Sequence, residues 1–169
     1  MKRTLRIGML LSVLLLLVVG ACAVRADVTI DMSKTGSITV KMKKSTQRSD
    51  WKGLEYSLYR IGDVLNEQGG LEYEPSGSFA SLQVDLNYSS SEEAKAAAAT
   101  VQNYINQNKI QPLQTEAAAA DGTTVFSNLP VGVYFGCLSK GEYVEVTPFI
   151  IPIPNYDEKT KSLNYDPEV

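Results

Sequence analysis

An alternation of apolar and polar residues runs through most of the chain, and it restricts the chain largely to β-structure. In the segment GSITVKMKK, Ile38, Val40 and Met42 fall on one face of a half-buried strand, and polar residues fall between them. A second strand follows the same period, with the inward set Leu54, Tyr56 and Leu58 and the outward set Glu55, Ser57 and Tyr59. Turn residues separate the further strand candidates TTVFSNL, GVYFGCL and EVTPFIIPIP. Many short strands with turns between them predict a β-sandwich.

The last part of the chain is predicted to lie at the margin of the sheets. Pro152 and Pro154 each lack the backbone donor that a ladder needs, so their run is expected at an edge. The segment PNYDEKTKSLNYD predicts a polar hairpin that returns into a final strand at 162–165. The runs 66–78 and 114–122 are predicted to be loops, with EAAAADG too short to assign.

One segment, SSSEEAKAAAATVQNYINQN, breaks the period of two and predicts a single helix over about 90–107. It begins with two overlapping capping boxes, Ser89 with Glu92 and Ser90 with Glu93. Alanine, the best helix former, fills its middle. A stripe at helical spacing consists of Ala94, Ala97, Ala98, Val101 and Ile105. Because the stripe is mostly small, the helix is expected to sit close to a sheet, as an insertion in the sandwich.

The first 26 residues have the layout of a secretory signal peptide. Lys2, Arg3 and Arg6 form a basic start, an almost wholly apolar stretch follows at 10–19, and small residues come after it. The apolar stretch is too short to span a bilayer comfortably. We therefore expect export to the extracellular space or the cell surface.

The end of the signal peptide allows more than one processing route. Cleavage after Ala26 is favoured because Asp27 opens a polar segment, and cleavage after Ala23 is the alternative. The stretch VGAC, which ends at Cys22, loosely resembles a lipobox, so Cys22 is a candidate for lipidation and the only expected link to a membrane. The mature chain, residues 27–169, is predicted to be one domain.

Charge and composition exclude several classes of function. Of the 16 basic residues four lie in the predicted signal peptide, and none of the 19 acidic residues does, so the mature chain has a net charge of −7. Such a surface repels phosphate, which makes nucleic acid and anionic membranes unfavourable partners. The chain has no histidine, and no Gly-x-Ser-x-Gly elbow or inward pair of acids is visible. We expect no enzyme, no cofactor and no metal site, and Cys137 alone cannot form a disulfide.

Five segments, taken in order, resemble the N-terminal domain of Gram-positive pilin backbone subunits: GSITVKM, LEYSLYRIGDV, YINQNKI, DGTTVFSNLPVGVYFGCL and TPFIIPIPNYD. These domains are the prealbumin-like or Cna-B-like β-sandwiches of sortase-assembled pili and surface adhesins. The resemblance covers about residues 33–165. It implies an immunoglobulin-like (prealbumin-like) fold and a structural or adhesive role at a cell surface, with other surface or pilus proteins as partners.

The resemblance also implies where a cross-link would lie. Many relatives join a buried lysine on the first strand to an asparagine or aspartate on the last, helped by a buried acid four residues after the tyrosine of the Leu-Pro-x-Gly turn. Tyr134 matches that tyrosine, so Leu138 stands at the position of the acid. Met42 ends the inward series of the first strand, where the lysine is expected, and Asn164 is left as an acceptor without a partner.

Side-chain parity decides whether a lysine could take part in this reaction. Lys41 and Lys43 lie beside Met42, but the period of two aims them at the opposite face of the strand. Slipping the strand by one residue would expose large apolar side chains, at about 1.5–3 kcal/mol each. We therefore expect an ordinary hydrophobic core and no Cna-B-type isopeptide bond.

Three other features are candidates for function. Cys137 lies on a strand without a flanking base, so an inert half-buried thiol is expected. The terminal hairpin gathers oxygen ligands that could hold calcium, although a solvated hairpin is the simpler interpretation: Asn155, Asp157, Glu158 and Asp166. Trp51 is the one aromatic residue on a predicted loop, and it either contacts a ligand or packs on the rim of the sheet.

The leading interpretation is an exported, non-catalytic structural or adhesive surface protein. The alternative is a secreted or lipid-anchored module that binds a host protein or a glycan, with Trp51 as a contact. The chain ends SLNYDPEV, without the Tyr-Pro-Lys-like motif and the Leu-Pro-x-Thr-Gly signal of polymerising pilins. We therefore expect a stand-alone form of the domain or a truncated pilin.

Overall fold

The computed structural model describes residues 29–42, 51, 53–67, 70–141, 146–157 and 159–169. The predicted signal peptide with Cys22, and also Lys43 and Glu158, lie outside the described residues. Within the described ranges no helix is long and apolar enough to cross a membrane.

The described chain consists mostly of strands and contains one α-helix. In chain order the elements are β1 (Thr35–Lys41), β2 (Glu55–Glu67), β3 (Gly70–Pro75), the short 3-10 helix η1 (Gly77–Phe79), α2 (Ser91–Asn108), β4 (Gln114–Ala117), β5 (Thr123–Pro130), β6 (Gly132–Lys140), β7 (Phe149–Ile153), β8 (Asn155–Asp157) and β9 (Ser162–Asn164). The helix occurs within one residue of its predicted bounds.

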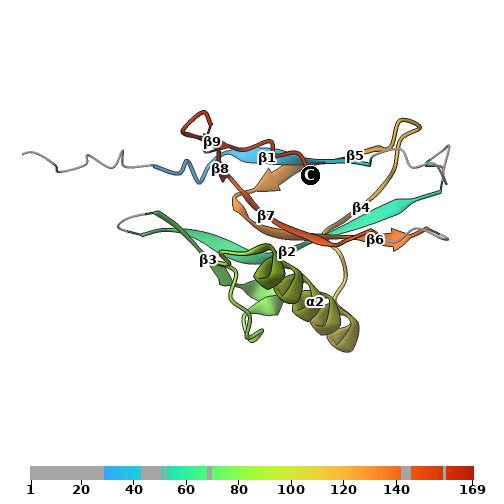
Figure 1. Cartoon of the computed structure of the whole chain (residues 1–169), viewed down its shortest axis with the longest axis horizontal. Coiled ribbons are helices and arrows are strands. Elements are labelled where there is room, and N and C mark those ends of the chain that lie inside the picture. The colour runs from blue at the N-terminus through green and yellow to red at the C-terminus, as the bar shows by residue number, and fades with distance from the viewer. Residues whose placement is uncertain (1–28, 43–50, 52, 68–69, 142–145, 158) are drawn as a thin grey trace, which may run out of the picture.

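Two sheets lie face to face, and the helix covers the outer side of the larger sheet (Figure 1). The larger sheet has the strand order β3–β2–β6–β7, and β4 also pairs with β2. β1 and β5 form the second sheet, in which Ile38 lies opposite Phe126 and Val40 opposite Thr124. All named strand pairs are antiparallel. The predicted β-sandwich with one helical insertion is confirmed.

The space between the two sheets is filled by a cluster that we call the interlayer core. Its buried members are Ile38, Val40, Tyr56, Leu58, Phe126, Leu129, Tyr134, Ile151 and Ile153. The inward sets predicted for the first two strands thus face the interior. Full burial stabilises such a side chain by roughly 1.5–3 kcal/mol, so the register of β1 is strongly fixed.

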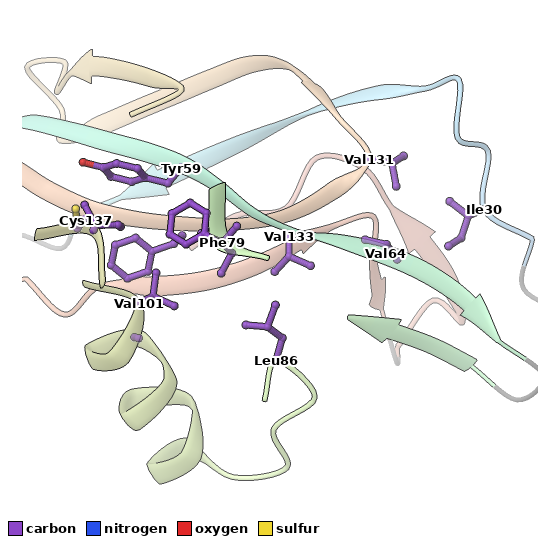
Figure 2. Close-up of a cluster of buried hydrophobic side chains, with 13 residues drawn as sticks. Ile30, Tyr59, Val64, Phe79, Leu86, Val101, Val131, Val133 and Cys137 are labelled. Carbon is purple, nitrogen blue, oxygen red and sulfur yellow. The ribbon is translucent and has the colours of Figure 1, made fainter. Parts of the chain in front are cut away.

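The other face of the larger sheet is buried beneath α2 in a helix-side core, which Figure 2 shows in close-up. Its members are Ile30, Tyr59, Ile61, Val64, Phe79, Leu86, Ala98, Val101, Ile105, Val131, Val133, Phe135 and Cys137. The outward, solvated positions predicted for Ser57 and Tyr59 are wrong, because these side chains are only 3% and 8% exposed. A central strand covered on both faces buries its second set as well, and the Ser57 hydroxyl lies 3.0 Å from that of Thr115 on β4.

The ends of α2 explain why the helix forms where it does. Ser90 is the N-cap, and its Oγ accepts a hydrogen bond from the Glu93 backbone N–H at 3.2 Å. The Glu93 carboxylate returns to the backbone N–H of Ser89 at 2.8 Å rather than to that of Ser90, so the predicted capping box is shared between two serines. Lys109, in a left-handed conformation with φ of 51°, ends the helix.

Two predicted loops contain strands. β3 lies inside the run 66–78 and β4 inside 114–122, so both loop predictions are wrong in part. β3 alternates over its six residues, with Leu71 and Tyr73 half-buried between exposed glutamates, but it is short and begins at the second of two glycines. β4 spans four residues and is held by its pairing with β2. Both strands depend on the long β2, and local propensity does not reveal them.

The predictions for the end of the chain are confirmed. β7 pairs with β6 at an end of the strand order, as its prolines require. The Tyr88 hydroxyl donates to the outer carbonyl of Ile150 on β7 at 3.1 Å. β8 and β9 form the polar hairpin, with Asn155 opposite Asn164.

Candidate functional site

The interior between β1 and β6 is where the sequence resemblance places a lysine and its helper acid. Met42 follows the end of β1, and Leu138 lies on β6. Both side chains are partly buried, and both pack against the interlayer core. A thioether and an isobutyl group contribute dispersion and apolar burial but no nucleophile and no proton donor.

No described lysine points into this interior. Among the described residues the buried polar or charged side chains are those of Ser57 and Thr124. Lys41 lies on the opposite face of β1, where its side chain is 55% exposed and its Nζ is 2.7 Å from Glu168 Oε1. An exposed lysine in an ion pair lacks the apolar surroundings that would free its amine for attack.

Asn164, the candidate acceptor, also lies away from a reactive partner. Its side chain is half-buried at the end of β9, and its Oδ1 accepts a hydrogen bond from the Asp166 backbone N–H at 2.9 Å. This local bond shapes the turn from β9 into the segment Tyr165–Val169, which we call the C-terminal tail. The side-chain amide of Asn164 therefore stabilises this local turn.

Two hydroxyl groups of this interior have no hydrogen-bond partner among the described residues. Tyr56 Oη and Thr124 Oγ1 are buried without a hydrogen-bond partner. Tyr56 lies opposite Leu138 in the ladder, and Thr124 lies opposite Val40. Burial raises the pKa of Tyr56. A neutral phenol and a neutral alcohol hold no charge that could replace the lysine or the acid of the cross-link.

The turn between β5 and β6 joins the two cores. Leu129, 0% exposed, belongs to the interlayer core, and Val131 belongs to the helix-side core. Tyr134 closes the turn, because its hydroxyl donates to the Pro130 carbonyl at 2.6 Å. Gly132 begins β6, and a Cβ there would lie 2.6 Å from Nε of Arg60 and 3.1 Å from the Gly62 carbonyl oxygen. The stretch that carries the family resemblance therefore packs and fixes both sheets.

Cys137 lies where the alternation predicts it, on the face of β6 that carries Val133 and Phe135. The thiol is free and 7% exposed. Burial raises its pKa to about 11, which disfavours the reactive thiolate. The geometry is that of an apolar core residue.

Trp51 lies in a loop, and its ring is only 4% exposed. A Cβ at Gly122 would lie 2.5 Å from the indole nitrogen, so the ring packs directly on this glycine. This burial favours the role of a packing residue, and a ligand contact through Trp51 stays a prediction.

Of the candidate calcium ligands in the terminal hairpin, Asp157 and Asp166 accept hydrogen bonds within the chain, whereas Asn155 Oδ1 is buried without a partner and Glu158 lies outside the described residues. Asp157 Oδ1 accepts the backbone N–H of Lys159 at 2.8 Å, and these bonds lower the pKa of its carboxyl. Asp166 Oδ1 accepts from the Ser37 hydroxyl at 2.8 Å. Within the described ranges no group of three or more acidic or cysteine side chains is placed to hold a metal ion.

Comparison with known proteins gives a fold and no family. No protein-family model matches the sequence, and no curated protein does. Among solved structures, the full-length major pilin SpaD of Corynebacterium diphtheriae matches with a TM-score of 0.51 and 22% identity, over 83% of this chain and 30% of SpaD. The resemblance to Gram-positive pilin backbone subunits is thus confirmed at the level of the fold.

Two further pilins are more distant. The T6 backbone pilin of Streptococcus pyogenes serotype M6, which has a modular three-domain structure, matches with a TM-score of 0.48 and 19% identity, over 82% of this chain and 28% of the pilin. The major pilin SpaA of C. diphtheriae matches with a TM-score of 0.43 and 17% identity, over 79% and 29%. The chain spans less than a third of the length of each of these three pilins.

Proposed function

We propose that this chain is an exported, non-catalytic structural protein of a Gram-positive cell surface, which works alongside other surface or pilus proteins. The observation that carries the proposal is the fold shared with a domain of the SpaD pilin. A signal peptide at residues 1–26 and a single domain at 27–169 complete it. The role would be to extend or decorate the surface.

We further propose that the domain has no internal isopeptide bond. The support is chemical: Met42 and Leu138 stand at the two positions where the resemblance places the reactive groups, and both pack against the interlayer core, which holds no charged side chain. The nearest lysine on β1, Lys41, is outside and paired with Glu168. Non-covalent packing and hydrogen bonds would then hold the first and last strands together.

The alternative is a module that binds a host protein or a glycan through loops at one end of the sandwich, with Trp51 as the candidate contact. Its ring is buried, so no described aromatic of that loop offers a stacking surface for a sugar. We therefore place this alternative among the outcomes of the experiment below.

Cell fractionation tests the proposal. The protein is expressed in a Gram-positive host and followed with an antibody, with metabolic lipid labelling of the wild type, of Cys22→Ser and of the matched control Cys137→Ser. We expect the protein in the envelope or the medium, with an N-terminus at Asp27, or at a lipid-labelled Cys22 if the lipobox is used. Label that Cys22→Ser alone abolishes would assign the anchor. An unprocessed protein in the cytoplasm would refute the proposal, and a released protein that binds glycans or host proteins would support the alternative.

A further inference from the structure

The C-terminal tail runs beside β1 in the parallel direction, so the first and last segments of the described domain are direct neighbours. Its bonds to β1 form a regular ladder of four: Ser37 N–H to Tyr165 O (3.1 Å), Thr39 N–H to Pro167 O (3.0 Å), Lys41 N–H to Val169 O (2.8 Å) and Val169 N–H to Thr39 O (2.9 Å). Thr39 and Glu168 form a parallel bridge. β1 therefore lies between β5 and the tail.

Side chains tie the two segments together on their outer face. The Ser37 hydroxyl donates to Asp166 at 2.8 Å, and Lys41, four residues further along β1, pairs with Glu168 at 2.7 Å. On the inner face Pro167 is buried. The tail is thus an extended segment bonded along β1, with exposed acidic side chains on its outer face and Pro167 on its inner face.

Further contacts hold the start of the tail, at Tyr165, against the segment before β1. The Tyr165 hydroxyl accepts from the Asp31 backbone N–H at 3.0 Å, and Lys34 Nζ lies 5.1 Å from the centre of the Tyr165 ring. The Tyr165 carbonyl lies so close to Gly36 that a Cβ there would be 1.9 Å from it. Contacts therefore extend along the full length of the tail.

This arrangement has a mechanical consequence. Tension on the two ends of the domain pulls β1 toward its N-terminal end at Thr35 and pulls the tail toward its C-terminal end at Val169. Because the two segments are parallel, they are pulled in opposite directions along their common axis. All four bonds then carry the load together, whereas strands that separate from one end break their bonds one at a time.

We propose that β1 and the C-terminal tail form a shear clamp that bears tension along the chain. The inference rests on the proposed surface role, in which a protein is anchored at one part and loaded at another. The clamp is non-covalent, so it opens under sufficient load and closes again when the load is removed. The exposed Lys41–Glu168 pair contributes little to it, because exposed ion pairs are screened by solvent and salt.

Single-molecule force spectroscopy of the chain with handles at its two ends tests the clamp. Val169→Pro removes one N–H of the ladder, and Val169→Ala is the matched control that keeps it. At a fixed force we expect Val169→Pro to unfold about 2- to 10-fold faster than the wild type, the range that loss of one hydrogen bond gives. Val169→Ala should stay within about twofold.

A second attachment point separates a load-bearing clamp from an ordinary stabilising contact. When the C-terminal handle is moved to Lys159→Cys, in the turn between β8 and β9, the tail lies outside the loaded part of the chain. The effect of Val169→Pro should then fall within about twofold. Equal effects of the two Val169 variants, or an equal effect of Val169→Pro at both attachment points, would overturn the proposal.

If Val169→Pro does not fold, Ser37→Ala removes the bond to Asp166 and takes its place, with the exposed Ser127→Ala on β5 as its control. Ser37→Ala should unfold faster under end-to-end load than Ser127→Ala, and equal rates would overturn the clamp. Cell fractionation tests the surface role independently of the clamp. If the protein is at the surface but its unfolding rate under load does not depend on the ladder, the clamp alone is refuted. If the protein is cytoplasmic, the proposed function alone is refuted.

Discussion

Replacing Gly36 with alanine is a sharp test of how the tail is packed on β1. Gly36 lies on β1, and a Cβ on it would meet the Tyr165 carbonyl oxygen at 1.9 Å, the Tyr165 carbonyl carbon at 2.8 Å and Ile153 Cγ2 at 3.1 Å. The first contact is with backbone, which cannot rotate away as a side chain does. The start of the tail must therefore move off β1.

The energetic effect follows from the contacts that this movement breaks. The lost bonds are Ser37 N–H to Tyr165 O and Asp31 N–H to the Tyr165 hydroxyl, each worth about 0.5–1.5 kcal/mol. The contact of Lys34 with the Tyr165 ring adds about 0.5–1 kcal/mol. Alanine restricts the unfolded chain and returns about 0.4–1 kcal/mol. We expect a net loss of about 1–3 kcal/mol in the free energy of unfolding.

Urea unfolding, followed by circular dichroism, measures this loss from the shift of the midpoint at an unchanged slope. The matched control is Gly70→Ala on β3, where a Cβ would meet nothing within 4 Å. This control should be neutral or up to about 1 kcal/mol more stable than the wild type. Equal stability of the two variants would show that the tail does not pack on Gly36 in solution.

Two further predictions concern buried groups with raised pKa values. Because burial raises the pKa of Cys137 to about 11, the folded protein should resist alkylation by iodoacetamide at pH 8 and react only after unfolding; a folded thiol that reacts as fast as the unfolded one would contradict this. Burial raises the pKa of Tyr134 to about 12, so the folded state keeps this proton more tightly than the unfolded chain does. The stabilisation that comes from this raised pKa is complete below pH 10 and is lost as the pH rises to about 12. The urea midpoint of Tyr134→Phe should therefore decline less than that of the wild type between pH 10 and 12. An equal decline in both proteins would contradict the prediction.

The sequence predicts the interlayer core well because a strand has a strict period of two. Ile38 and Val40 on β1, and Tyr56 and Leu58 on β2, face inward as their alternation requires. The helix is equally predictable from the sequence, since capping serines and an alanine-rich middle act locally. Local signals thus fix which residues face the space between the sheets.

The sequence does not predict how β2 is covered on its second face. Alternation assigns Ser57 and Tyr59 to the outward face of the strand, but both side chains are buried. The pattern of one strand carries no information about a distant helix that covers this face. β3 and β4 are missed for a similar reason, since their pairing with β2 supplies the stability that their short sequences lack.

The parallel pairing of the tail with β1 has no signal in the local sequence pattern, although the family resemblance implies that the first and last strands are close. The partners of the tail on β1 are about 130 residues away along the chain, as for Ser37 and Asp166. The tail itself contains Pro167 between two acidic residues, which is typical of a turn. The burial of Trp51 is likewise not predictable from local sequence, because the ring packs on Gly122, which is distant along the chain.

The intact mass of the mature protein, secreted and purified without denaturation, tests the central claim that unreactive apolar side chains occupy the cross-link position. With Met42 and Leu138 at that position, the mass should equal the sum of the residues from the experimentally determined N-terminus, plus any lipid on Cys22. A mass lower by one ammonia or one water, with a lysine joined to an asparagine or aspartate in the peptide map, would contradict it.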